Sequence, residues 1–177
     1  MIAREHDNLR SVMSRAESAG DLATLARIAG RLWPFWWTRG LVAEGRLTLE
    51  GLLPRRAALE PALQALALHA AGRLMLLQGA YAPAGRSLEE SLQGYRRLGD
   101  QAAAADALSG LGVVAGYQQD NARAEDLWSQ ALQAYEALGD RWGVARALNN
   151  LGTWPSTSAT TRPPSSAWRK ACPSSAS

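Results

Sequence analysis

Apolar side chains recur along this chain with the period of a helix. Leu108, Leu111 and Ala115 follow one another at intervals of three and four residues, which places them on one helical face. A second run with the same spacing extends from Ala124 to Tyr135. Sustained alternation of polar residues with β-branched or aromatic ones, the pattern of a strand, is not found. The hydrophobic pattern therefore predicts an all-α fold.

The pattern repeats along the chain, so that position 65 corresponds to position 105 and position 100 to position 140. Thirteen of the 36 positions over 65–100 are identical to their counterparts over 105–140, without a gap. The identities include glycine, tyrosine and Gly-Asp pairs, which a chain rich in Ala and Leu does not produce by composition alone. A third copy begins at Ala145. Each copy predicts a hairpin of two helices, and hairpins must stack because one alone cannot bury its apolar face.

Turn residues and small residues fix the expected geometry of each hairpin. Residues 119–121 (Gln-Asp-Asn) predict the turn inside the second copy. Residues 139–140 (Gly-Asp) predict its end, since Gly suits a left-handed helix terminus and Asp caps the next helix. Close helix crossings are expected at the small residues Gly72, Gly112, Ala84, Ala124, Ser91 and Ala131, with Leu88 and Trp128 filling the gap between hairpins.

The N-terminal third has the same architecture in a more diverged sequence. In order, we expect a helix over 6–17, a break at 20–21, a helix over 22–38, a turn at residue 40, a helix over 41–53 and a linker or capped turn over 54–61. Pro34 falls inside the second helix and predicts a kink, because proline lacks the N–H that the helix uses. Three parts follow: diverged hairpins over 1–61, repeats over 62–152 and a tail over 153–177.

The repeat resembles the tetratricopeptide repeat. Its pattern of Leu108, Leu111, Gly112, Ala124, Trp128 and Ala131 is similar to that family's W-x-x-L-G … A … F … A signature. The first copy matches less completely, and the period exceeds the usual length of about 34 residues. HEAT and armadillo repeats have a period closer to the one found here, but they do not normally carry this placement of Gly and Ala. The resemblance implies a right-handed superhelical stack of antiparallel helix hairpins, an α-solenoid that binds a protein partner.

A narrower resemblance covers the N-terminal segments 5–10, 29–40 and 44–46. They look like the start of the C-terminal helical region of bacterial transcriptional regulators of the LuxR and antibiotic-regulatory types, which contain a signal-transduction ATPase module. This resemblance implies a fragment or stand-alone relative of such a regulator, with an upstream ATPase module as one partner. The P-loop pattern G-x-x-x-x-G-K-[ST] is absent, as is a recognisable DNA-binding helix-turn-helix, so neither activity carries over.

In tetratricopeptide arrays the first helix of each hairpin lines a groove that takes a peptide or a partner helix. The resemblance implies the following solvent-facing partner-binding residues: His69, Arg73, Leu77, Ser109, Val113, Tyr117, Asn149 and Asn150. Asn150 matches a place where peptide-binding members often carry an Asn that bonds the ligand backbone, because an amide donates and accepts at once. The alternative is that Asn149 and Asn150 are simply a polar face. A ligand gripped by its C-terminal carboxylate is not expected, since the repeats contain no Lys.

Catalytic, metal and cofactor sites are not predicted. His69 has no nucleophile or carboxylate in a fixed relation to it, so a surface or packing role is expected. One cysteine, Cys172, and two histidines exclude a disulfide framework and a Cys/His metal cluster. Trp33, Trp36 and Trp37 have helical spacing and are expected in the core and at an interface. An exposed Trp37 would mark the docking site of the upstream module.

Charge separates the repeats from the tail. The formal net charge is +3, from 19 Lys and Arg against 16 Asp and Glu. Residues 1–152 hold 16 arginines and all 16 acidic residues, so the excess lies in the tail. A nucleic-acid-binding helical array remains the second hypothesis. It requires positively charged side chains along the groove. Arg73 and Arg146 meet this requirement, whereas Asp106 is an opposing negative charge.

The tail begins where the third copy breaks off, at Thr153-Trp154-Pro155. Residues 153–177 are rich in Ser, Thr and Pro and contain no acid, which predicts disorder. A repeat cut in mid-helix is also the pattern expected of an out-of-frame translation, or of a truncated product without function. With about two and a half repeats, self-association is expected as well.

A soluble cytoplasmic protein is the remaining expectation. The first residues do not form a signal peptide. The most apolar stretch, 22–37, is interrupted by Arg27, Arg31 and Pro34 and is too short and too charged to span a bilayer.

Overall fold

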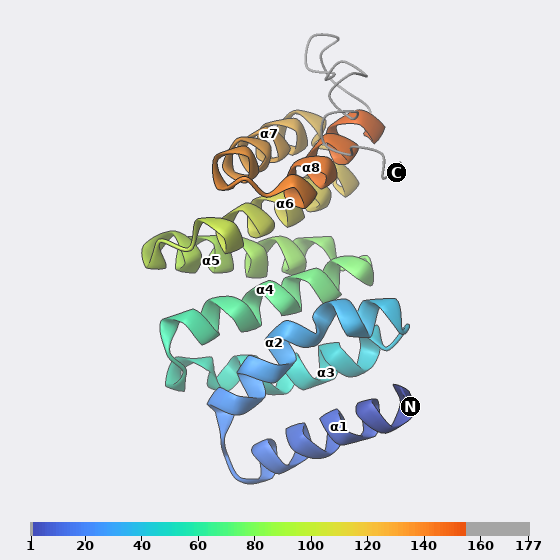
Figure 1. The fold of residues 1–177 in the computed structure, drawn as a ribbon, viewed down its shortest axis with the longest axis vertical. Coiled ribbons are helices and arrows are strands. Elements are labelled where there is room, and N and C mark those ends of the chain that lie inside the picture. The colour runs from blue at the N-terminus through green and yellow to red at the C-terminus, as the bar shows by residue number, and fades with distance from the viewer. Residues whose placement is uncertain (1, 155–177) are drawn as a thin grey trace, which may run out of the picture. The chain divides into compact units, whose positions relative to one another are not determined.

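The computed structural model describes residues 2–154, with side chains from Asp7 onwards. All regular structure in this range is helical, as eight α-helices and one 3-10 helix (Figure 1). The predicted all-α fold is therefore confirmed. The tail predicted to be disordered, residues 153–177, lies outside the described residues except for Thr153 and Trp154.

The chain divides into two compact units, residues 1–94 and residues 95–177. Unit 1 contains α1 (Ile2–Ser18), α2 (Leu22–Thr38), α3 (Val42–Leu52), the 3-10 helix η1 (Leu53–Ala58), α4 (Pro61–Leu77) and most of α5 (Tyr81–Leu98). Unit 2 contains the end of α5, α6 (Gln101–Tyr117), α7 (Asn121–Leu138) and α8 (Arg141–Thr153).

The helices repeat with the period seen in the sequence. Helices α4 and α6 begin at corresponding positions of the first and second copies, and so do α5 and α7. Gly139 ends α7 with a φ of +70°, a left-handed conformation that glycine adopts at little steric cost. The carboxylate of Asp140 then accepts hydrogen bonds from the backbone N–H groups of Trp142 and Gly143, at 3.1 and 3.0 Å. The Gly-Asp pair thus acts as predicted at this boundary.

The N-terminal helices agree closely with expectation. Helix α2 has the predicted bounds and continues through Pro34. Its N-cap, Asp21, accepts a hydrogen bond from the Thr24 N–H at 3.0 Å, which lowers the pKa of the Asp21 carboxyl. Helix α1 begins four residues earlier than predicted, and η1 occupies much of the expected linker over 54–61. Arg56 of η1 forms an ion pair of 3.2 Å with Glu90 of α5.

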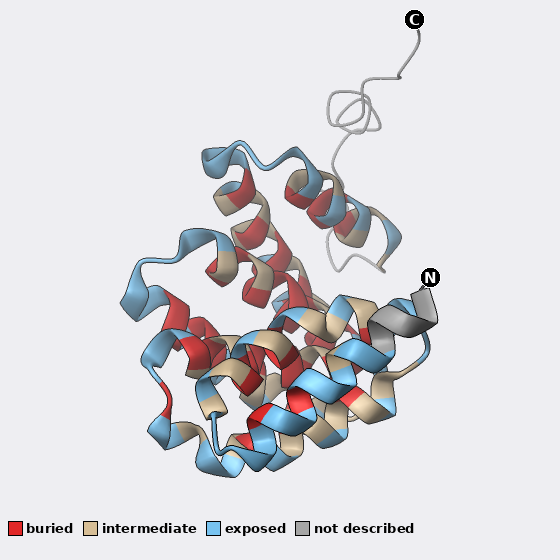
Figure 2. Ribbon diagram, turned by 60° about the horizontal axis from the view of Figure 1, so that its bottom comes forward, coloured by how far each residue is buried: buried red, intermediate tan, exposed pale blue. Residues whose placement is uncertain are grey.

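The core of unit 1 is built where α2, α3 and α4 meet, on the faces that Figure 2 colours as buried. Trp36 of α2 is fully enclosed there, together with Leu49, Leu52 and Leu74. Helix α3 passes Trp36 at Gly45, where an added Cβ would lie 2.3 Å from the indole. A small residue on the second helix of this hairpin therefore makes room for a large one on the first.

The later hairpins use the opposite arrangement. A Cβ added at Gly72 would lie 2.7 Å from Leu88, and one added at Gly112 would lie 2.4 Å from the Trp128 indole nitrogen. The predicted close crossings at both glycines are confirmed. Leu88 and Trp128, predicted to lie between hairpins, each pack on the glycine of their own hairpin.

Candidate partner-binding surfaces

In unit 1, helices α2 and α4 come close together at Gly30. A Cβ added at Gly30 would lie 2.5 Å from the side chain of Leu66, so only glycine permits this approach. Trp33 and Trp37 lie one and two turns further along the same flank of α2. The position of Gly30 therefore brings both indoles to the line along which α2 meets α4.

Trp33, Trp37, His69 and Arg73 form a group that we name the Trp33 cluster. The Trp33 and Trp37 rings are stacked, with centroids 6.4 Å apart. The guanidinium carbon of Arg73 lies 4.6 Å from the centroid of the Trp33 ring, within the range of a cation–π interaction. The His69 ring lies 6.3 Å from the Trp33 ring. Trp37 is 54% exposed, so the cluster presents an open aromatic face.

The three predicted partner-binding residues of unit 1 differ in exposure. Leu77 is exposed and Arg73 is half-buried. His69 is only 7% exposed, so the expectation that it faces solvent is wrong. Its ring is packed beside the Trp33 indole, a bulky neighbour that the pattern within α4 does not reveal. Trp37, whose exposure would mark a docking site, is exposed.

The five predicted residues of unit 2 also differ. Tyr117 and Asn149 are exposed, whereas Val113 and Asn150 are half-buried. Ser109 is 1% exposed, so its expected solvent-facing position is wrong. The Trp128 indole nitrogen donates a hydrogen bond of 3.2 Å to the Ser109 carbonyl, which shows that this turn of α6 packs under α7.

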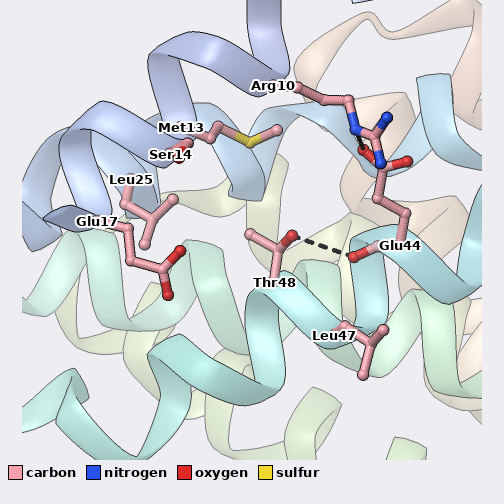
Figure 3. Close-up of a pocket in the computed structure, with 8 residues that line it drawn as sticks. All are labelled: Arg10, Met13, Ser14, Glu17, Leu25, Glu44, Leu47 and Thr48. Atoms are coloured by element: carbon pink, nitrogen blue, oxygen red, sulfur yellow. Dashed lines mark hydrogen bonds and ion pairs between the residues drawn. The ribbon is translucent and has the colours of Figure 1, made fainter. Parts of the chain in front are cut away.

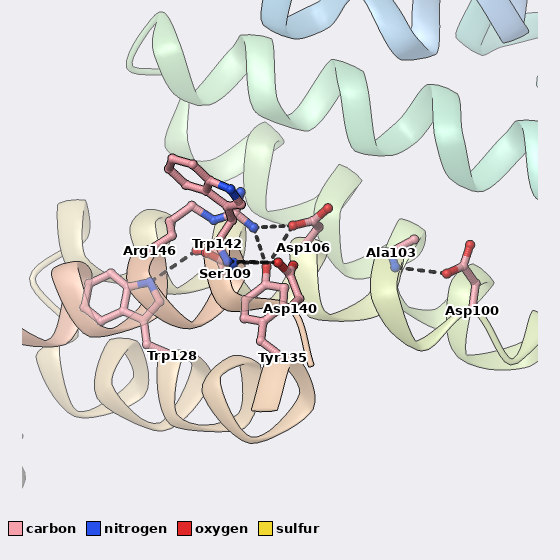
Figure 4. A network of polar contacts seen from close by, with 10 residues as sticks. Asp100, Ala103, Asp106, Ser109, Trp128, Tyr135, Asp140, Trp142 and Arg146 are labelled. Carbon is pink, nitrogen blue, oxygen red and sulfur yellow. Dashed lines mark hydrogen bonds and ion pairs between the residues drawn. The ribbon is translucent and has the colours of Figure 1, made fainter. Parts of the chain in front are cut away.

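A polar network joins three helices of unit 2 (Figure 4). The Tyr135 hydroxyl of α7 donates a hydrogen bond of 2.8 Å to the Asp106 carboxylate of α6. Arg146 of α8 forms an ion pair with the same carboxylate, and its guanidinium carbon lies 5.4 Å from the centroid of the Tyr135 ring. Burial raises the pKa of the Tyr135 phenol, and the negative charge of Asp106 raises it further.

This network pairs Arg146 and Asp106, two charged residues that the sequence analysis expected along the groove. Arg146 and Asp106 neutralise each other. The cation that a nucleic-acid-binding array would require at Arg146 is thus already paired with a carboxylate of the same unit.

Trp154 was assigned to the tail, but it belongs to the packing of unit 2. A Cβ added at Gly116 would lie 2.5 Å from the Trp154 indole. The Trp154 ring also meets the Tyr117 ring edge to face at 5.2 Å and lies 5.6 Å from the Trp128 ring. The feature of the sequence that could have indicated this contact is Gly116, because a glycine inside a helix, where no turn requires it, often marks a close approach by another side chain.

A pocket of ≈ 500 Å³ opens in unit 1 between α1, α2 and α3 (Figure 3). It is lined by Arg10, Met13, Ser14, Glu17, Leu25, Glu44, Leu47 and Thr48. Arg10 and Glu44 form an ion pair of 3.1 Å across it, and Met13 and Leu25 are buried beneath. Sequence reasoning did not find this pocket, because its walls come from three helices that each present an ordinary amphipathic face.

Residues 2–154 contain no group of three or more His, Cys, Asp or Glu side chains placed to hold a metal ion. No helix in this range is both long enough and apolar enough to cross a membrane.

No protein-family model matches this sequence, and none of the curated proteins compared with it matches either. Its function must therefore be argued from the surfaces described above.

Proposed function

We propose that this chain is a protein–protein interaction module whose main contact surface is formed by α2 and α4. The Trp33 cluster carries the proposal. A half-exposed indole, Trp37, stacks on a second indole that is itself held by Arg73. Trp and Arg are the residues most enriched among those that dominate the free energy of binding at protein interfaces.

The proposal includes the architecture implied by the tetratricopeptide resemblance. The helix pairs would stack as a right-handed superhelical array, the repeat portion of a LuxR-type bacterial regulator acting in the cytoplasm. Support comes from the helix period, which equals that of the sequence repeat, and from the close crossings at Gly72 and Gly112. Such an array binds by matching side chains along its first helices to a partner segment.

Unit 2 would add polar recognition. The side-chain amides of Asn149 and Asn150 form no hydrogen bond with any described residue, and both reach the surface of α8. An amide donates and accepts at once, so either can pair with a peptide backbone. A nucleic-acid ligand is less well supported because Arg146 is already paired with Asp106.

Selection from a phage-displayed random-peptide library tests the proposal. The full chain is the target, and the Trp37→Ala variant is used for counter-selection. The enriched peptides are then titrated by fluorescence anisotropy. We expect Trp37→Ala to weaken binding by about tenfold or more, as for a residue at the centre of an interface. The double variant Asn149→Ala/Asn150→Ala should weaken it to a smaller extent.

Trp142→Ala is the matched control, because Trp142 is 87% exposed and lies on another helix. It should leave the affinity unchanged. If no peptide is enriched over the Trp37→Ala target, the proposed function is wrong. Peptides that bind equally well to the wild type and to Trp37→Ala would also contradict it.

A further inference from the structure

The two helices that form the proposed contact surface carry arginines and no acidic residue. Residues 22–43, which include α2, contain three arginines and no Asp or Glu. Residues 61–88, which include α4, contain two arginines and again no acid. Over residues 1–152 as a whole, 16 arginines are balanced by 16 acidic residues. The absence of acids from these two stretches is thus a local feature in a neutral body.

Two arginines of α2 precede the exposed indole of Trp37 along the helix. Arg27 and Arg31 lie one turn apart on the exposed side of the helix. Asp21, the N-cap of the same helix, has its pKa lowered mainly by the Thr24 N–H and to a smaller degree by Arg27. Arg31 forms no ion pair with any described residue. The surface therefore has an aromatic centre with positive charge beside it.

Arg73 supplies positive charge from the other helix. Its guanidinium lies over Trp33, while Trp37 stacks against that same indole. A guanidinium held over an aromatic ring remains positively charged and adds to the potential of the surface. Both helices of the proposed contact surface thus carry arginine side chains.

We infer that the segment docking on this surface is an acidic peptide. Its apolar side chains would cover Trp37, and its carboxylates would meet Arg27 and Arg31 on the exposed side of α2. The inference rests on the proposed function and gives the chemistry of the partner. Charge complementarity of this kind selects partners, because a basic segment would place like charges together with no acid on either helix to offset them.

A peptide fits these observations better than a nucleic acid does. Nucleic-acid binding draws its affinity from many phosphate contacts, whereas this surface offers only a few cations in a body of zero net charge. Base stacking needs open aromatic faces. Trp33 has Arg73 over its ring and Trp37 stacked on it, so Trp37 offers the main open face.

The test uses the peptides enriched on the full chain. We expect most of them to carry net negative charge and at least one aromatic or large aliphatic residue. For a representative peptide, a second version is synthesised with Gln and Asn in place of Glu and Asp. The acidic version should bind about tenfold more tightly at low salt, and the difference should shrink at about 0.5 M NaCl.

A charge reversal gives the sharper readout. Arg27→Glu/Arg31→Glu should lose the preference for acidic peptides and should enrich basic ones from the same library. The matched control is Arg96→Glu/Arg97→Glu, which reverses two exposed arginines on α5 and should keep the acidic preference. Far-UV circular dichroism of each variant checks that the helices are intact.

Failure of this inference is distinct from failure of the proposed function. Enriched peptides that depend on Trp37 but are neutral or basic would overturn the acidic partner and leave the interaction module standing. The absence of any Trp37-dependent peptide would overturn the module itself. Tighter binding of a single-stranded oligonucleotide than of the acidic peptide, lost in Arg27→Glu/Arg31→Glu, would assign the surface to nucleic acid instead.

Discussion

Replacing Gly112 with alanine tests how the hairpins of this protein are packed. The added methyl carbon would lie 2.4 Å from the indole nitrogen of Trp128, and 2.6 and 2.8 Å from two neighbouring ring carbons. Trp128 is fully buried, and its indole N–H donates to the Ser109 carbonyl at 3.2 Å. A flat, rigid ring in this position cannot turn aside as a flexible side chain can, so α6 and α7 must move apart.

Three contributions set the magnitude. Overpacking of a tight core costs about 1–3 kcal/mol of unfolding free energy. Movement of Trp128 also breaks its hydrogen bond, and a buried polar group left without a partner costs about 1–3 kcal/mol. Alanine is the better helix former by about 1 kcal/mol, which offsets part of the loss. We expect a net destabilisation of about 2–3 kcal/mol.

Urea unfolding followed by far-UV circular dichroism and tryptophan fluorescence measures this effect. Gly51→Ala is the matched control, because no atom lies within 4 Å of the position its methyl group would take and the residue is exposed on α3. It should be neutral or stabilising, by up to about 1 kcal/mol. The packing argument is refuted if Gly112→Ala unfolds at the same urea concentration as the wild type, or at a higher one.

Three further outcomes are expected. Gly72→Ala should destabilise less than Gly112→Ala, because its methyl group meets the flexible Leu88, and an equal loss measured by urea unfolding would contradict this. Asp140→Ala should cost about 1 kcal/mol in the same assay, since two backbone N–H groups lose their cap; an unchanged midpoint would show that water replaces it. The third outcome concerns pH. The folded chain holds the Tyr135 proton more tightly than the unfolded chain, because burial and Asp106 raise its pKa in the folded state. The stabilisation is thus complete below the unfolded pKa of about 10 and is lost as the pH rises above it. Tyr135→Phe should flatten this alkaline loss in thermal melts, whereas a slope like that of the wild type would exclude Tyr135 as its source.

Local signals allowed the helices to be predicted with good accuracy. The bounds of α2 and α7 follow from the Gly-Asp or polar turns that flank them, and these turns act through hydrogen bonds only a few residues long. Contacts between helices were harder. The burial of His69 depends on the size of Trp33, which lies on another helix, and no periodicity within α4 contains that information.

Trp154 is a second residue whose contacts with other helices could not be predicted from its sequence neighbours. Its neighbours in sequence are Thr and Pro, so composition assigned it to the tail. Its neighbours in space are Gly116, Tyr117 and Trp128, all on other helices. Gly116 of α6 was the only feature of the sequence that indicated this contact, and it can be interpreted only once its aromatic partner is known.

The hairpins of the two units place their large aromatic residues in opposite ways. In unit 1, the α2–α3 crossing places Trp36 on the first helix and Gly45 on the second, whereas in unit 2 Gly112 lies on the first helix and Trp128 on the second. Trp36 is the large aromatic residue in the core of its hairpin, and the stacked indoles of Trp33 and Trp37 lie outside that contact, with Trp33 beside His69 and Arg73 of α4 and Trp37 exposed. In unit 2 the Trp128 and Tyr135 rings are buried. Unit 2 also exposes aromatic rings, Tyr117 and Trp142. The exposed indole of unit 1 differs in being stacked on a second indole that Arg73 covers, and this arrangement is why the proposal assigns the main contact to unit 1.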